Sequence, residues 1–126
     1  MKEEKKYEVK IIDGSRTLTN REIVKYTNLT SAISLADQEE GLVLLVKGYV
    51  KVQVNNEYSK DNSIYDILYL ETDEGIYKTS SETFIRNFKN IWNQMKDEIG
   101  EGLEIVLVNI PSNNFKGNNI LSCNLV

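Results

Sequence analysis

Residues 42–54 read LVLLVKGYVKVQV, and this stretch decides the fold of the chain. The first part, 42–46, is continuously apolar. The second part alternates, with three valines on one side of a strand and, on the other, Lys47, Tyr49, Lys51 and Gln53. Gly48 stands where the pattern changes, and a glycine inside a strand commonly marks a bend. We therefore expect one long, bent strand that serves two parts of a sheet.

Four more strands are expected after this one. The first two, over 64–71 and 76–79, are joined by Asp73-Glu74-Gly75, which suits a hairpin whose glycine takes a left-handed conformation. The last two are expected over 103–110 and 120–126.

A long helix is expected between 76–79 and 103–110. Apolar side chains recur there at helical spacing, namely Phe84, Phe88, Ile91, Trp92, Met95 and Ile99. Thr79 and Glu82 have the spacing of a capping box, and Gly100 suits the C-terminal cap. A stripe of this kind can line a ligand pocket, but core packing is the interpretation that we favour.

The resulting order of strand, strand, strand, helix, strand, strand is that of the OB-fold, a five-stranded barrel that binds oligonucleotides and oligosaccharides. We assign residues 41–126 to such a barrel within one mainly β domain. Residues 1–40 are expected to pack on it as a charged arm, a short strand over 7–12 and a short helix over 21–26 capped by Thr19 or Asn20.

The composition excludes several functions. The chain has no histidine, which removes the commonest metal ligand and the usual general base near neutral pH. A single cysteine, Cys123, leaves no zinc site, so we expect neither a metal nor a cofactor, and no enzyme. The apolar run 42–46 is too short to cross a membrane, and we expect a cytoplasmic protein. The net charge of -4 argues against coating duplex DNA but allows single-strand binding in a local basic groove.

The polar side of the long strand is the first candidate binding surface. A base stacks on a ring such as that of Tyr49 while the ammonium groups of Lys47 and Lys51 meet phosphates, and this needs no sequence readout. The same residue types also occur on an ordinary solvated strand face.

In the loop before the last strand, Phe115 lies beside Lys116 where no core periodicity requires a ring, which is typical of a stacking residue. The alternative is that Phe115 anchors the loop on the barrel.

The second strand of the barrel adds three candidates. Tyr65 and Tyr69 share one face of it, and Lys78 lies across the hairpin, so these residues would extend the stacking platform. The pattern does not settle which face points outward, because Asp66 interrupts an apolar set of Ile64, Leu68 and Leu70.

Three stretches carry a family resemblance. They are Thr17-Leu18-Thr19-Asn20-Arg21-Glu22 with Asn28 and Ala32-Ile33-Ser34-Leu35; Ser81-x-Thr83-Phe84-x-x-x-Phe88-x-x-Ile91; and Pro111-Ser112-Asn113-Asn114-Phe115-Lys116-Gly117-Asn118-Asn119-Ile120-Leu121-Ser122-Cys123. In these stretches the chain resembles small single-stranded DNA-binding proteins of phages and conjugative plasmids of Gram-positive bacteria. The resemblance implies an OB-fold, binding of single-stranded DNA with little sequence preference, and a role in replication, recombination or plasmid transfer.

We therefore expect a protein of a bacterial host cell that coats single-stranded DNA, either alone or with self-association along the strand. RNA would fit the same stacking platform. One alternative is a protein-interaction module of a mobile element that docks a host protein, which the acidic balance favours. Another is an enzyme that uses only carboxylates, whose substrate the sequence does not reveal.

Phe115→Ala tests the loop. We expect it to weaken binding of labelled oligo-dT by about 1–3 kcal/mol, the usual contribution of one stacked base. Fluorescence anisotropy measures the change. Unchanged affinity would contradict the proposed stacking role of Phe115.

Overall fold

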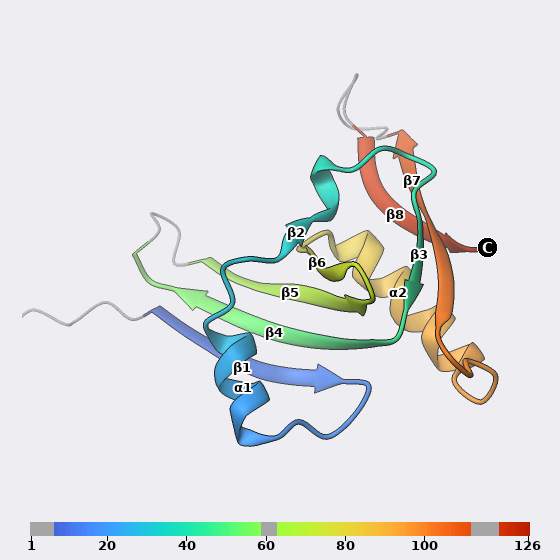
Figure 1. The fold of residues 1–126 in the computed structure, drawn as a ribbon. Helices are drawn as coiled ribbons and strands as arrows, with labels where there is room; N and C mark the ends of the chain where they lie inside the picture. The colour runs from blue at the N-terminus through green and yellow to red at the C-terminus, as the bar shows by residue number, and fades with distance from the viewer. Residues whose placement is uncertain (1–6, 59–62, 112–118) are drawn as a thin grey trace, which may run out of the picture.

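The computed structural model describes residues 7–58, 63–111 and 119–126 and shows a mainly β architecture (Figure 1). The elements are, in chain order, β1 (Tyr7–Gly14), α1 (Asn20–Thr27), β2 (Ile33–Ser34), the 3-10 helix η1 (Leu35–Asp37), β3 (Val43–Val46), β4 (Gly48–Asn56), β5 (Ser63–Thr72), β6 (Gly75–Thr79), α2 (Glu82–Met95), β7 (Leu103–Pro111) and β8 (Asn119–Leu125). Every strand and helix expected from the sequence is present, and β2 and η1 are additional.

The long strand is bent as expected, and its two halves belong to different sheets. β4 joins a five-stranded sheet of order β1-β4-β5-β6-β2, whereas β3 joins a three-stranded sheet of order β3-β7-β8. The break falls at Lys47, between the two strands. The backbone at Gly48 is closely approached there, because a Cβ at this position would lie 2.6 Å from Glu71 Oε1 and 2.9 Å from Ser15 Oγ, so that one of these side chains would have to move.

The predicted closure of the strands into a barrel is not observed among the described residues. β6 pairs with β5 and with the two-residue strand β2, and β8 pairs with β7 alone. The two sheets are therefore connected through the bend between β3 and β4 but share no strand pair in the described parts of the chain. Figure 1 shows the smaller sheet standing beside one end of the larger one.

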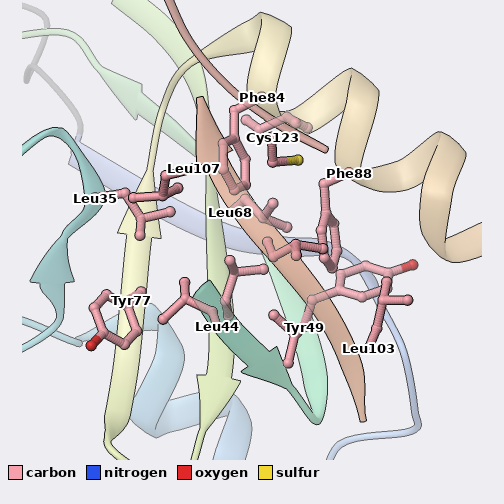
Figure 2. Close-up of a cluster of buried hydrophobic side chains, with 14 residues drawn as sticks. Leu35, Leu44, Tyr49, Leu68, Tyr77, Phe84, Phe88, Leu103, Leu107 and Cys123 are labelled. Atoms are coloured by element: carbon pink, nitrogen blue, oxygen red, sulfur yellow. The ribbon is translucent and has the colours of Figure 1, made fainter. Parts of the chain in front are cut away.

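The main core lies between α2 and the two sheets. It contains the fully buried rings of Phe84 and Phe88 together with leucines of β3, β5 and β7 (Figure 2). The remaining residues of the predicted apolar stripe are partly buried and pack against this core, namely Ile91, Trp92, Met95 and Ile99. Core packing, the interpretation favoured from the sequence, is thus confirmed for the helix.

The caps of α2 differ from those expected. Ser81, not Thr79, is the N-cap, and its Oγ accepts a hydrogen bond from the backbone N–H of Phe84 at 3.2 Å. Thr79 is a buried residue of β6, and its Oγ1 accepts a bond from the N–H of Ser81 instead. The helix ends at Met95, ahead of the predicted Gly100, which has a φ of 58° in the turn that follows.

The opposite face of the larger sheet carries a second, smaller core. The valines of β4 are fully buried there against Tyr26 of α1 and Tyr69 of β5. Thr19, one of the two residues proposed from the sequence as the cap, is the N-cap of α1 and forms a complete capping box with Glu22. Leu35 is also fully buried, in the main core, whereas Ile33 is partly exposed and pairs with β6. The N-terminal segment thus covers one face of the sheet, and α2 covers part of the other.

One polar contact ties β1, β4 and α2 together. Lys89 Nζ lies 2.5 Å from Asp13 Oδ2, and it also donates a hydrogen bond to the Tyr49 hydroxyl. Burial alone would raise the pKa of Asp13, but hydrogen bonds from Lys89 and from the backbone of Gly14 outweigh it, so the pKa lies below its ordinary value. The ion pair also holds the pKa of Lys89 above its ordinary value, although burial opposes this shift.

Asp13→Asn tests this contact. Asparagine keeps an Oδ1 that can accept from the Gly14 N–H, as Asp13 does at 2.9 Å, but it loses the charge that faces Lys89. Because the folded pKa is lowered, the contribution of the carboxylate is present above its ordinary pKa of 3.8 and is lost as the pH falls below that value. We expect the variant to lose at most about 1 kcal/mol at neutral pH, since the pair is partly exposed.

The measurement is urea unfolding followed by the fluorescence of Trp92, the single tryptophan. The difference between wild type and variant should shrink as the pH is lowered toward about 2. A difference that stays constant over this range would show that the charge of Asp13 does not stabilise the fold.

Candidate functional site

Four of the candidate residues line three adjoining hollows around the first half of β5: Lys51, Tyr65, Tyr69 and Lys78. They meet because Tyr65 and Tyr69 lie on one face of β5, with Lys78 directly opposite Tyr69 on β6. Lys51 lies on the other face of the sheet. Tyr65 lines all three hollows.

The first hollow, here called the tyrosine groove, runs between the sheet and the end of α1. It has a volume of about 490 Å³ and is lined by Tyr7, Val9, Tyr26, Thr27, Asn28, Leu29, Thr30, Val54, Tyr65, Ile67, Tyr69 and Lys78. Strand pairing builds its floor, because Val54 of β4 has Val9 of β1 on one side and Tyr65 of β5 on the other. Four tyrosines thus surround one lysine.

The tyrosines of the groove differ in what they expose. Tyr7 is 57% exposed and Tyr65 39%, whereas Tyr69 is only 4% exposed and packs on the ring of Tyr26 at 5.5 Å. Burial raises the pKa of Tyr69, so its phenol stays neutral at physiological pH. Tyr7 and Tyr65 therefore offer ring surface to a ligand, and Tyr69 forms part of the wall.

Among the described residues, Lys78 is the one charged residue in the lining of the tyrosine groove. Its side chain is half-buried and forms no ion pair with another described residue. No aspartate or glutamate is present among the lining residues that the structure describes. In a chain with a net charge of -4, a described lining with one cation and no carboxylate is a local exception.

The second hollow, the serine hollow, continues the groove toward β8. It has a volume of about 360 Å³, shares Tyr65, Ile67 and Lys78 with the groove, and adds Ser34, Ala36, Thr79, Ser80, Ser81 and Leu121. Ser81 closes this end, because its Oγ donates a hydrogen bond to the carbonyl of Leu121 at 2.8 Å.

The third hollow, the cationic hollow, lies on the opposite face of the sheet, beside α2. It has a volume of about 520 Å³ and is lined by Lys51, Gln53, Ile64, Tyr65, Asp66, Ser80, Glu82, Ile85, Arg86, Lys89 and Asn90. Tyr65 and Ser80 are common to this hollow and the serine hollow. Lys51 Nζ lies 3.8 Å from Asp66 Oδ2, so its charge is partly balanced.

The expected exposure of Tyr49 is wrong. Its side chain is only 3% exposed and packs edge-on against Phe88, with ring centroids 5.5 Å apart (Figure 2). It also packs edge-on against Trp92, at 5.3 Å. Both faces of β4 are covered at this point, so the residue that alternates with the buried valines is buried as well. No base can stack on this ring in the folded protein.

Lys47 is exposed as expected, but it lies apart from the hollows. Its ammonium group is 3.5 Å from Asp73, near the turn that joins β5 and β6. Lys47 precedes Gly48, which pairs with Glu71, whereas Tyr65 pairs with Val54. Six residues of strand separate these positions, or about 20 Å. Phe115 and Lys116, the two loop candidates, lie outside the described residues.

Tyr7 and Arg86 were not identified from the sequence as candidates. The alternation of Tyr7, Val9 and Ile11 could have placed Tyr7 on one strand face, but not which strand β1 would join. Arg86 lies on α2 away from the apolar stripe, and only the packing of α2 against the sheet brings it near Lys51. The positions of Tyr7 and Arg86 beside the hollows therefore depend on contacts between residues far apart in the sequence.

A hydrogen-bonded network holds α1 over the sheet and so maintains the wall of the tyrosine groove. The Tyr26 hydroxyl donates to Glu71 Oε2 at 2.6 Å, and Arg16 contacts both Glu71 and Glu22, at 3.0 and 2.5 Å. The hydrogen bond from Arg16 lowers the pKa of Glu22 to about 2. Burial and the bond to Glu71 raise the pKa of the Tyr26 phenol.

Other chemistry has little support in the described residues. Cys123 is buried, and burial raises the pKa of its thiol to about 12, as expected for an inert cysteine. Within residues 7–58, 63–111 and 119–126, no three acidic or cysteine side chains lie close enough together to hold a metal ion. None of the helices in these parts of the chain is both long and apolar enough to cross a bilayer.

Comparisons with protein-family models, with curated proteins and with solved structures found no match for this chain. Evidence about function therefore comes from the geometry and chemistry of the hollows.

Chemical nitration of tyrosine tests the observed exposures. We expect tetranitromethane to modify Tyr7, Tyr58 and Tyr65 first, because these rings are open to solvent, and to spare Tyr26, Tyr49 and Tyr69. Peptide mass spectrometry after brief treatment identifies the modified residues. Modification of Tyr49 as fast as that of Tyr65 would contradict the burial of β4 on both faces.

Proposed function

We propose that this protein binds single-stranded DNA in the tyrosine groove. The observation that carries the proposal is the open ring of Tyr65 beside Lys78 in a depression whose described lining residues include no carboxylate. Stacking on aromatic rings combined with a cation that meets the backbone is the usual chemistry of sequence-tolerant single-strand binders.

Each part of the groove has a role in this proposal. The rings of Tyr7 and Tyr65 stack with bases, and either ring accepts any base because every base has a π face. Lys78 contacts a phosphate, and it is available because no described carboxylate neutralises it. Tyr69 and Val54 form an apolar floor, which favours bases over a fully hydrated ligand.

The strand order supports an OB-fold as the architecture behind this site. The succession β8-β7-β3, bend, β4-β5-β6, with α2 between β6 and β7, is the order of an OB barrel without the closing pair. We propose that the chain is a divergent OB-fold protein, and that the resemblance to phage and plasmid single-stranded DNA-binding proteins reflects a shared role in replication, recombination or transfer.

A second candidate function is docking of a host protein, and the outer edge of β1 favours it. Within the described parts of the chain, β1 pairs with β4 alone, and its residues Tyr7 and Ile12 are exposed. An unpaired strand edge can accept an extended segment of another protein. Because Tyr7 belongs to both this edge and the tyrosine groove, a Tyr7 variant would affect both functions. A direct measurement of oligonucleotide binding distinguishes them.

The direct test is fluorescence anisotropy of labelled oligo-dT at two salt concentrations, with duplex DNA and oligo-U as competitors. Salt-sensitive binding that duplex DNA competes for poorly would support the proposal, and oligo-U would rank RNA against DNA. If micromolar protein binds no oligo-dT at low salt, single-strand binding is wrong and protein docking becomes the better candidate.

Two variants test the assigned residues. We expect Tyr65→Ala to weaken binding by about 1–3 kcal/mol through the loss of one stacked base. Lys78→Ala should lower the slope of log affinity against log salt by about 0.7, the value for one phosphate contact on a single strand.

Matched controls are Tyr58→Ala and Lys96→Ala, which alter exposed residues outside all three hollows. Both should bind as the wild type does, with unchanged Trp92 fluorescence. Should Tyr65→Ala and Lys78→Ala also bind normally, the tyrosine groove is not the binding site.

A further inference from the structure

The open edge of β5 lies between the tyrosine groove and the cationic hollow. β6 pairs with β5 only from Leu68 onward, so 64–67 has a neighbour in β4 but none on the other side among the described residues. Tyr65 stands on this free edge and lines the hollows on both faces. Ser80, just after β6, also lines hollows on both sides. A ligand in the groove therefore has an open path around the edge.

The cationic hollow has the side chains that a nucleic-acid backbone requires. Its lining contains Lys51, Arg86 and Lys89, and the amides of Gln53 and Asn90. Lys51 and Lys89 are engaged with Asp66 and Asp13, at 3.8 and 2.5 Å. Arg86 is exposed and forms no ion pair with another described residue. The guanidinium group of Arg86 is thus the cation free to meet a phosphate.

An apolar surface accompanies these cations at the edge itself. Ile64, which is 62% exposed, lies on the free edge next to Tyr65. Ile85 of α2 also lines the cationic hollow. Bases that extend beyond the tyrosine groove would contact the apolar side chains of Ile64 and Ile85 rather than charged groups. The carboxylates in the lining are Asp66, which faces Lys51, and Glu82, in the first turn of α2. A nucleic-acid strand that passes close to Arg86 meets a positive charge rather than these carboxylates.

We propose that a single strand bound in the tyrosine groove crosses the free edge of β5 at Tyr65 and continues into the cationic hollow, where Arg86 contacts its backbone. This path rests on the proposed single-strand binding and adds to it a second contact surface on the opposite face of the sheet. It makes affinity depend on oligonucleotide length. An oligonucleotide of about four nucleotides fills one surface, and one of about twelve reaches both, within the range known for a single domain of this size.

The experiment compares dT4 and dT12 binding to wild type, Arg86→Ala, Arg86→Lys and Lys78→Ala. We expect Arg86→Ala to weaken dT12 binding about threefold to tenfold and to lower its salt slope by about 0.7, with dT4 unaffected. Arg86→Lys keeps the charge and should retain most of the affinity for dT12. Lys78→Ala should weaken both oligonucleotides, because Lys78 lies in the primary groove.

Arg21→Ala is the matched control, since Arg21 is an exposed arginine of α1 that lines none of the three hollows. Trp92 fluorescence checks that each variant folds. If Arg86→Ala binds dT12 like Arg21→Ala while Lys78→Ala weakens it, the path is overturned and the groove stands. Equal weakening of dT4 and dT12 by Arg86→Ala would also overturn the path. If the wild type binds neither oligonucleotide, the proposed function itself fails.

Discussion

The structure depends on the burial of β4 on both of its faces. Its valines pack against α1 on one side, and on the other side Tyr49 packs against α2. The part of β4 around Tyr49 therefore presents no binding face, and only its far end, at Lys51, Gln53 and Val54, contributes to the hollows. At the bend, the side chains of Glu71 and Ser15 approach Gly48 so closely that a Cβ there would displace them. The centre of the sheet is therefore committed to packing.

The available surface gathers instead at the far end of the larger sheet. There β5 extends beyond the reach of β6, and α2 begins only after Ser81. One helix covers each face incompletely, so the sheet end remains open on both sides of Tyr65. A single incomplete strand pairing thus produces the groove, the free edge and the cationic hollow together. This placement also explains why the predicted residues separate into one group near Tyr65 and an isolated Lys47.

Local patterns in the sequence were sufficient for the elements. The apolar stripe of α2, Thr19 as one of two cap candidates for α1 and the turn before Gly75 agree with the structure, because each depends on residues within a few positions. Both predicted caps of α2, Thr79 and Gly100, were wrong. The burial of Tyr49 could not be predicted from such local patterns. Alternation places it opposite the buried valines, but only the position of α2 determines whether that side is open. The pairing of β1 with β4, which brings Tyr7 to the groove, depends on the same kind of long-range contact.

An acidic protein can hold an anionic ligand only if its carboxylates are kept away or neutralised. Here Glu71 and Glu22 are both engaged by Arg16, Asp13 by Lys89, and Asp66 by Lys51. Of these pairs, only Lys51–Asp66 has both partners in a hollow, and Lys78 and Arg86 have no acidic partner among the described residues. At physiological ionic strength the field of unpaired surface carboxylates decays over about 8 Å, so more distant acidic residues contribute little at the groove. The local arrangement of charge, more than the net charge of -4, then determines what the hollows can bind.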